Sequence, residues 1–123
     1  MTAAEEVSEA ISAYDVALKD GDLAIVDSWF LDSGLASRFG VDEVAYGAAA
    51  IAASRRESRA APVARGERVD GRRELIVLGD DVVVATLEHR QRGENSRRRR
   101  TQVWWRIEPG VWRIAHAHLS IER

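Results

Sequence analysis

Tyr14 is the one polar side chain in a series of apolar residues, and its hydroxyl could donate a hydrogen bond to a carbonyl compound. With Val7, Ile11 and Leu18 it forms a stripe at helical spacing, which predicts one face of a helix. A ring on that face can pack in a core, but its hydroxyl needs a hydrogen-bond partner. The hydroxyl therefore either completes a core hydrogen bond or points into a cavity, where it could donate to a substrate carbonyl or a developing oxyanion.

Arg38 is the second unusual side chain, because it is the only arginine among residues 1–50. Those residues contain ten Asp or Glu and one other cation, Lys19, whereas residues 51–123 contain sixteen arginines and ten acids. Arg38 lies in an apolar segment that reads as a strand, and a buried arginine needs a partner. It either forms a structural ion pair, with Glu43 or an acid of the first helix, or binds a substrate carboxylate through two parallel hydrogen bonds.

Two histidines two residues apart, His116 and His118, fall on a predicted strand. At that spacing they would share a strand face with three other residues, namely Trp112, Ile114 and Ser120. A His-x-His pair can supply two of the three or four ligands of a zinc site, but His89 is isolated, and we expect no metal. We expect His118 to act as a hydrogen-bonding or general acid–base group, the alternative being a structural role.

The four consecutive arginines at residues 97–100 could suggest nucleic-acid binding. On a strand they point to alternate faces, so they form no single patch, and the formal net charge of the chain is −2. We therefore expect no nucleic-acid partner. Arg98 and Arg100 share a face with Gln102, Trp104 and Arg106, and alternation leaves open whether that face is a pocket wall or the outer surface. Arg55 is a further candidate, on a predicted helix.

Length and composition favour one soluble domain, residues 1–123, because 46% of the residues are hydrophobic and 31% are charged. The absence of cysteine excludes disulfides, thiolate metal sites and a cysteine nucleophile. The longest uncharged run, residues 44–54, is too short to span a membrane, and the acidic start lacks the features of a signal peptide. We expect a cytoplasmic protein without a membrane partner, and the lack of phosphate-loop and nucleophile-elbow motifs favours a protein without cofactors.

Helical patterns come first along the chain and strand patterns follow. Apolar spacing and caps predict helices over residues 7–18, 22–30 and 46–59, with Asp22 as an N-cap and Pro62 after the last helix. Strands are expected at residues 35–39, 73–78, 82–92, 98–107 and 111–121. Tight turns join the later strands, which predicts an antiparallel sheet in an α+β domain with its helices packed on one face.

Several segments in this order resemble the AtzH-like family, in the SnoaL-like clan of the nuclear transport factor 2-like superfamily. They are Tyr14-Asp15-Val16-Ala17-Leu18, Trp29-Phe30, Arg38-Phe39-Gly40 with Glu43, Tyr46-Gly47, Gly79-Asp80, Glu88 with Arg90, Arg99 with Gln102 and Trp104, and Trp112-Arg113-Ile114 with His118 and Ser120. The resemblance implies a cone-shaped domain whose N-terminal helices pack on a curved antiparallel sheet. It also implies a cavity between helices and sheet, and a homodimer through the outer sheet face.

The resemblance further implies a small anionic substrate, because members of the family are linked to the breakdown of ureide-type carboxylates such as dicarboxyurea or oxalurate. We expect Tyr14, Arg38 and His118 to be catalytic. The expected substrate-binding residues are Trp29, Tyr46, Arg55, Gln102 and Trp104. The sequence departs from the family at several of the expected pocket positions; for example, Arg98 and Arg100 stand where glycine and glutamine often flank the strand arginine.

Three hypotheses for function follow. The first is an enzyme without cofactors that hydrolyses or decarboxylates a small carboxylated urea or amide. The second is a non-catalytic ligand-binding or dimerisation module, which the substituted pocket positions favour. The third is an isomerase or dehydratase acting on an apolar ring, which would need an aromatic, arginine-poor cavity.

Overall fold

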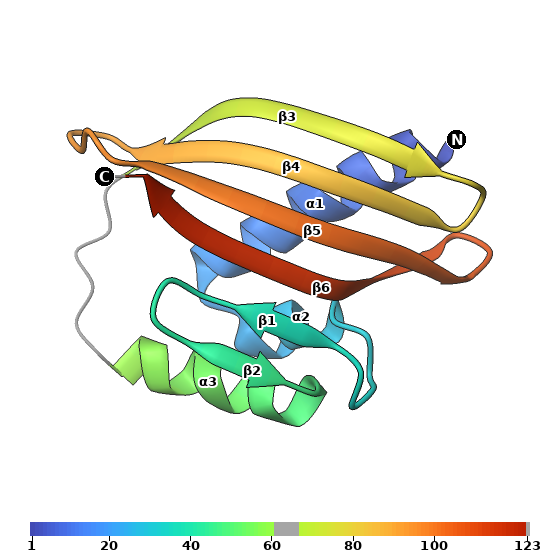
Figure 1. Cartoon of the computed structure of the whole chain (residues 1–123), viewed down its shortest axis with the longest axis horizontal. Helices are drawn as coiled ribbons and strands as arrows, with labels where there is room; N and C mark the ends of the chain where they lie inside the picture. The colour runs from blue at the N-terminus through green and yellow to red at the C-terminus, as the bar shows by residue number, and fades with distance from the viewer. Residues whose placement is uncertain (61–66, 123) are drawn as a thin grey trace.

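The computed structural model describes residues 1–60 and 67–122, which contain three helices and six strands and confirm the α+β class. The elements, in chain order, are α1 (Ala3–Asp20), α2 (Leu23–Ser28), β1 (Ser37–Phe39), β2 (Val44–Tyr46), α3 (Ala48–Ala60), β3 (Arg68–Leu78), β4 (Val82–Gln91), β5 (Arg97–Glu108) and β6 (Val111–Glu122). Figure 1 shows one sheet with α1 crossing behind its long strands and α3 lying beside the β1–β2 hairpin. In the part of the chain that is described, no helix is long and apolar enough to cross a membrane.

The first helix is fixed at both ends by local interactions. Thr2 and Glu5 form a reciprocal capping box at its start, and Gly21 ends it in the left-handed conformation at φ 73°. Between these caps, Val7, Ile11 and Tyr14 are buried, which confirms the helical stripe read from the sequence. The helix therefore turns Tyr14 toward the sheet.

The strands form one sheet in the order β2-β1-β6-β5-β4-β3. The hairpin pairs from β3 to β6 are antiparallel, as expected, but β1 pairs with β6 in parallel, which corrects the wholly antiparallel prediction. No tight turn joins β1 to β6, so nothing forces that pair to be antiparallel.

Other element boundaries also differ from the prediction. The three-residue strand β2 was missed, because Tyr46 was assigned to the start of the following helix and residues 44 and 45 to no element. Strand β3 begins five residues earlier than expected, before a register shift between Asp70 and Arg73. The predicted break at Pro62 lies outside the described residues.

A β-bulge in β6 changes which side chains face the helices. Val103 pairs with His116, whereas the next residue, Trp104, pairs with Ile114, so Ala115 has no partner on β5. The extra residue reverses the alternation along β6. Trp112 and Ile114 are therefore buried on the inner face, and the side chains of residues 116 and 118 turn to the outer face.

The core fills the space between the helices and the inner face of the sheet. Its largest fully buried side chains are Trp104, Ile11, Ile51, Ile114, Val7, Val26 and Val83. These residues come from all three helices and from β4, β5 and β6. The core thus ties α1 and α3, which carry Tyr14 and Arg55, to the strands that face them.

The junction between β2 and α3 gives a testable constraint on that positioning. Gly47 has a φ of +90°, and its N–H donates to the carbonyl oxygen of Ala36. We expect Gly47→Ala to lower the free energy of unfolding by about 1–2 kcal/mol, because a Cβ is strained at positive φ. Gly34→Ala is the control, since Gly34 lies against Gly47, has no positive φ and leaves open space for a Cβ. Urea unfolding followed by circular dichroism measures both, and equal effects would contradict the backbone explanation.

Candidate functional site

A cavity of about 820 Å³ lies between α1, α3 and the inner face of the sheet. Its charged lining residues are Lys19, Arg38, Arg55, Arg68, Arg98, Arg100, Asp15, Glu67 and Asp70. Six of these are basic and three acidic, so the lining carries a surplus of positive charge. A cavity with such a lining favours a small anion over an apolar ring.

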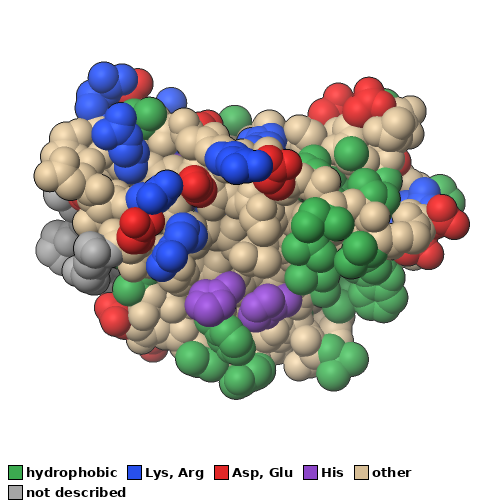
Figure 2. Space-filling model, turned by 45° about the horizontal axis from the view of Figure 1, so that its top comes forward, with side chains coloured by type: hydrophobic (Ala, Val, Ile, Leu, Met, Phe, Trp, Pro, Cys, Tyr) green, Lys and Arg blue, Asp and Glu red, His purple; other side chains and the backbone are tan. Residues whose placement is uncertain are grey.

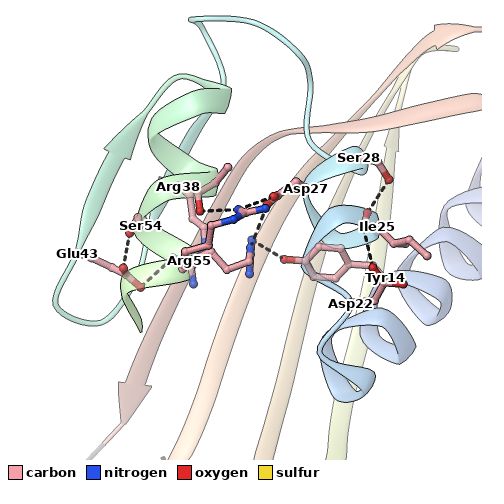
Figure 3. A network of polar contacts seen from close by, with 11 residues as sticks. Tyr14, Asp22, Ile25, Asp27, Ser28, Arg38, Glu43, Ser54 and Arg55 are labelled. Carbon is pink, nitrogen blue, oxygen red and sulfur yellow. Dashed lines mark hydrogen bonds and ion pairs between the residues drawn. The ribbon is translucent and has the colours of Figure 1, made fainter. Parts of the chain in front are cut away.

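At one end of the cavity, the Tyr14 hydroxyl accepts a hydrogen bond from Nη2 of Arg55 at 3.3 Å. Tyr14 is 4% exposed and Arg55 7%, and the Tyr14 ring packs edge-on against Phe30. Because the hydroxyl accepts from Arg55, its own proton is available to donate to a ligand. Figure 3 shows this contact, with Arg55 reaching from α3 toward Tyr14 on α1.

Arg55 is buried, so its charge needs a partner, and Asp27 supplies it. Its Nε lies 3.5 Å from Oδ1 of Asp27, and the other oxygen of that carboxylate accepts from Nη1 of Arg56 at 2.8 Å. The guanidinium also lies 5.6 Å from the Phe30 ring centroid. Both the Arg55 Nε and the Asp27 Oδ1 lack a geometrically sound hydrogen bond, so this pair is loosely matched.

Arg38 enters the same cavity from β1. Its Nη1 donates to Oε1 of Glu43 at 2.9 Å, and Ser54 on α3 donates to the other oxygen of Glu43. The ion pair expected between Arg38 and Glu43 is therefore present. Arg38 nevertheless lines the cavity and stays 15% exposed, so the pair orients its guanidinium without removing it from the site.

Gln102 belongs to the cavity wall on β5, and it is 2% exposed. Its side-chain oxygen accepts from the indole nitrogen of Trp104 at 3.0 Å, which leaves the amide nitrogen to donate. The inner face of β5 thus carries Arg98, Arg100 and Gln102 as pocket wall. This resolves the choice between pocket wall and outer surface that alternation had left open.

The other end of the cavity contains a second group of charges, centred on Asp15 of α1. Arg100 binds its carboxylate with two hydrogen bonds, at 2.8 and 3.2 Å, and Arg68 adds an ion pair at 3.2 Å. Burial alone would raise the pKa of Asp15, but the hydrogen bond and charge of Arg100, with those of Arg68, outweigh it and hold that pKa below its usual value.

His89 lies beside these charges on β4, 6% exposed. Burial, together with the charges of Arg68, Arg100 and Arg98, lowers the pKa of His89 to about 4, and Asp15 opposes the shift. The imidazole is therefore neutral at pH 7. Its Nδ1 is buried and has no hydrogen-bond partner.

The remaining predicted residues lie away from this network. Although His118 borders the cavity, its side chain is exposed and its ring packs against Phe39, which faces outward on β1. The expectation that His116 and His118 share a face with Trp112 and Ile114 is wrong, because the bulge at Ala115 reverses the alternation between them. In Figure 2, histidine side chains are visible side by side on the surface of the molecule.

Three predicted substrate-binding residues occupy other positions. Trp104 is fully buried in the core and stacks edge-on with Trp29 at 5.8 Å between ring centroids. Tyr46 is 67% exposed and stacks on Phe39. None of these three lines the cavity, whereas Tyr14, Arg38, Arg55 and Gln102 all do.

Sequence reasoning missed the Asp15, Arg68 and His89 end of the cavity. The face that Arg98 and Arg100 share with Gln102 could have indicated basic residues in the cavity, but the sequence does not show which helix residue contacts them. Among the residues that the structure describes, no cluster of three or more histidine, aspartate or glutamate side chains could hold a metal ion.

The AtzH-like family model matches residues 2–123. Among curated proteins, no relative matches. A crystal structure of a protein of unknown function from Pectobacterium atrosepticum, assigned to the DUF3225 family, is 31% identical and superposes with a TM-score of 0.84, covering 97% of this chain and 90% of the other.

Two further solved structures extend the comparison. A cystatin-like fold protein from Burkholderia xenovorans is 29% identical, with a TM-score of 0.83 over 95% of this chain and 89% of the other. A nuclear transport factor 2-like superfamily protein from Salmonella enterica is 22% identical, with a TM-score of 0.73 over 94% and 88% of the two chains. The latter likeness concerns the fold alone, which is that of the nuclear transport factor 2-like proteins.

The low pKa of His89 predicts a pH-dependent stability. An imidazole in an unfolded chain titrates near pH 6.5, so between about pH 6.5 and 4 the unfolded chain binds a proton that the folded chain does not. The free energy of unfolding therefore falls as the pH falls through this window, by about 3 kcal/mol in all. Besides burial, the charges that set this behaviour are those of Arg68 on β3, Arg100 and Arg98 on β5, and Asp15 on α1. The exposed Asp70 lies opposite His89 on β3.

Denaturant unfolding at about pH 7 and pH 4.5 measures this loss in the wild type and in His89→Leu. We expect the variant to lose much less stability than the wild type over that interval. His118→Gln is the control, since its side chain is exposed and its replacement should leave the wild-type pH dependence intact. If the free energy of unfolding falls equally in the wild type and in His89→Leu, groups other than His89 cause the pH dependence.

Proposed function

Because this chain belongs to the AtzH-like family, we propose that it is an enzyme without cofactors that acts on a small carboxylated urea or amide. The observation that carries the proposal is the convergence of Tyr14, Arg55 and Arg38, from three different elements, on one cavity with a surplus of basic side chains. Such donors match the two polar features of a carboxylated urea, a carboxylate and a neighbouring carbonyl oxygen.

In this proposal each donor has a defined task. Arg38 orients a carboxylate of the substrate, and Tyr14 donates to the carbonyl oxygen, supported by the positive charge of Arg55. The amide nitrogen of Gln102 supplies a further donor. Glu43 already shares the charge of Arg38, so Arg38 can orient a carboxylate without forming the strong ion pair that would oppose its loss as neutral carbon dioxide.

Decarboxylation suits these residues better than hydrolysis. Hydrolysis needs a base that activates water, but Asp15 is engaged by two arginines, and Glu67 and Asp70 are exposed at the cavity mouth. In a decarboxylation, the bond between nitrogen and the carboxylate carbon breaks, carbon dioxide leaves, and the electron pair stays on nitrogen. The nitrogen then takes a proton from the Tyr14 hydroxyl, and water restores that proton.

Two alternatives remain distinct from this proposal. A non-catalytic module would bind the same anions and form no product. The other alternative is an isomerase or dehydratase that acts on an apolar ring. A proposed ketosteroid isomerase from Shewanella frigidimarina has a similar fold at 19% identity. The arginines that line this cavity argue against such a substrate.

The first test removes the Tyr14 hydroxyl. We expect Tyr14→Phe to lower kcat for decarboxylation of a carboxylated urea by about 10²–10³, the usual effect of losing one donor to a developing oxyanion. The ring and its contact with Phe30 are kept, so the melting temperature should change little. Carbon dioxide release, with the urea product followed by nuclear magnetic resonance, measures the rate.

Tyr46→Phe is the matched control, because it removes the same atom from an exposed ring outside the cavity and should leave kcat within about twofold. Arg38→Gln should instead weaken binding of the carboxylate, seen as a raised Kd and KM. Binding of carboxylated ureas by the wild type without product over hours would replace the enzyme proposal with the non-catalytic module. If only apolar ring compounds raise the melting temperature of the wild type, the arginine-based site is wrong.

We also propose that two copies of the chain associate through the outer face of the sheet. Ile76 on β3 and Trp105 on β5 are 52% and 44% exposed, and both lie on that face. Beside this apolar region, the same face has alternating charges, including the ion pairs of Arg97 with Glu88 and Glu122. An apolar region flanked by paired charges of both signs is suited to self-association.

A charge in the apolar region tests the dimer. We expect light scattering coupled to gel filtration to give a dimer mass for the wild type and a monomer mass for Trp105→Glu, because burying an unpaired carboxylate is costly. Ile25→Glu is the control, since Ile25 is similarly exposed, at 49%, but lies on α2 away from the sheet. A monomeric wild type at high protein concentration would exclude the proposed interface.

A further inference from the structure

The end of the cavity opposite Tyr14 presents several buried polar atoms without partners. His89 and Arg98 are directly opposed on β4 and β5, and Arg100 lies two residues along β5 on the same inner face. The buried atoms without a hydrogen bond there are Nδ1 of His89, Nε of Arg98 and Nε of Arg100. His89 is 6% exposed, so an unsatisfied nitrogen on its ring carries a real cost.

The charges at this end are also incompletely balanced. Arg68 and Arg100 pair with Asp15, while Arg98 on β5 and Asp70 on β3 lie on either side of His89 in the sheet. The ion pair of Arg98 with Glu94 is long, at 3.7 Å, and Glu94 is 44% exposed, so it offsets little of the Arg98 charge. One positive charge is therefore left over beside the unpartnered nitrogens.

The spacing along β5 separates this end from the Tyr14 end. Gln102 pairs with Ala117, which in turn pairs with Arg38, so Gln102 marks the row of residues at the Tyr14 end. Arg98 is four residues away on the same strand, which is about 13 Å at roughly 3.3 Å per residue. A molecule that touched both ends would have to be longer than a simple carboxylated urea.

We propose that Arg98, Arg100 and His89 form a second oxyanion-binding subsite, and that the natural ligand is an elongated molecule with an anionic group at each end. Arg98 and Arg100 donate through their free Nε atoms, and His89 donates through Nδ1 in the tautomer that carries its proton there. The far group is a carboxylate or another oxyanion with the same acceptor geometry. The inference that the substrate is elongated rests on the proposed function. The inference that these three residues bind an oxyanion does not depend on it.

The first experiment looks at the subsite directly, with sulfate as the probe and no turnover involved. Sulfate keeps its charge across the pH range in which His89 titrates, and a bound dianion would offset the arginine charges around the ring. We expect saturating sulfate, compared with chloride at the same ionic strength, to raise the pKa of His89 from about 4 by one unit or more, measured from its ring resonances. The ring resonances of His118, which is exposed on the outer face, are the internal reference for effects of sulfate outside the subsite.

Arg98→Gln should abolish this rise in the pKa of His89. Arg97→Gln is the matched control, because Arg97 is the neighbouring residue on the same strand but bonds Glu88 and Glu122 on the outer face. It should respond to sulfate like the wild type. An unchanged His89 titration in wild-type protein with sulfate would overturn the subsite without reference to any variant, as would an undiminished response in Arg98→Gln.

The second experiment measures the length of the ligand. Straight-chain dicarboxylates from three to eight carbons are compared by calorimetry with monocarboxylates of equal length. We expect the second carboxylate to tighten binding about tenfold or more only in the longer members, and Arg98→Gln to remove that gain while leaving monocarboxylate binding unchanged. Equal affinities for mono- and dicarboxylates at every length would overturn the elongated ligand.

These outcomes separate the subsite from the proposed function. If carboxylated ureas are not turned over but sulfate still raises the pKa of His89 in an Arg98-dependent manner, the subsite stands and the proposed reaction falls. If Tyr14→Phe abolishes turnover while His89 ignores sulfate, the reaction stands and the subsite falls.

Discussion

Arginines that folding removes wholly or partly from water need carboxylate partners, and this need is the constraint on which the arrangement of this domain depends. Arg100 and Arg68, on the sheet, share Asp15 of α1. Arg55 on α3 is held by Asp27 of α2, and Arg38 on β1 by Glu43 in the turn that follows. Because an unpaired buried guanidinium is costly, these pairs fix how helices and strands meet.

This pairing gives a physical reason for the uneven charge of the sequence. Residues 1–50 contain ten acids and two cations, and the sixteen arginines follow after residue 50. In the folded chain, Asp15 and Asp27 from the acidic part meet Arg100, Arg68 and Arg55 from the basic part. An uneven charge distribution can suggest a nucleic-acid surface, but here these acidic and basic side chains neutralise one another inside the domain. What is left over lies in the cavity, where basic lining residues outnumber acidic ones.

The sequence was sufficient for features that depend on neighbours along the chain. The stripe through Tyr14, the Asp22 cap, and the alternation that places Arg98 and Arg100 on one strand face with Gln102 are all local, and all are present. Features that depend on distant segments were not predictable. The parallel pairing of β1 with β6 joins residues almost 80 positions apart. Of the candidate site, Tyr14, Arg38, Arg55 and Gln102 line one cavity, whereas Trp29, Tyr46 and Trp104 do not.

The histidines show most clearly why a site cannot be read from spacing alone. His116 and His118 have the spacing typical of functional pairs, but one unpaired residue, Ala115, turns both rings outward. His89 has no neighbouring motif at all, and it is the one that folding buries among three arginines and leaves with an unpartnered nitrogen. A histidine on a strand gains chemical character from what lies across the sheet and on the helix above it. For His89 those groups are Arg98 on the next strand and Asp15 on α1, so its properties arise only once the acidic helix closes over the basic sheet.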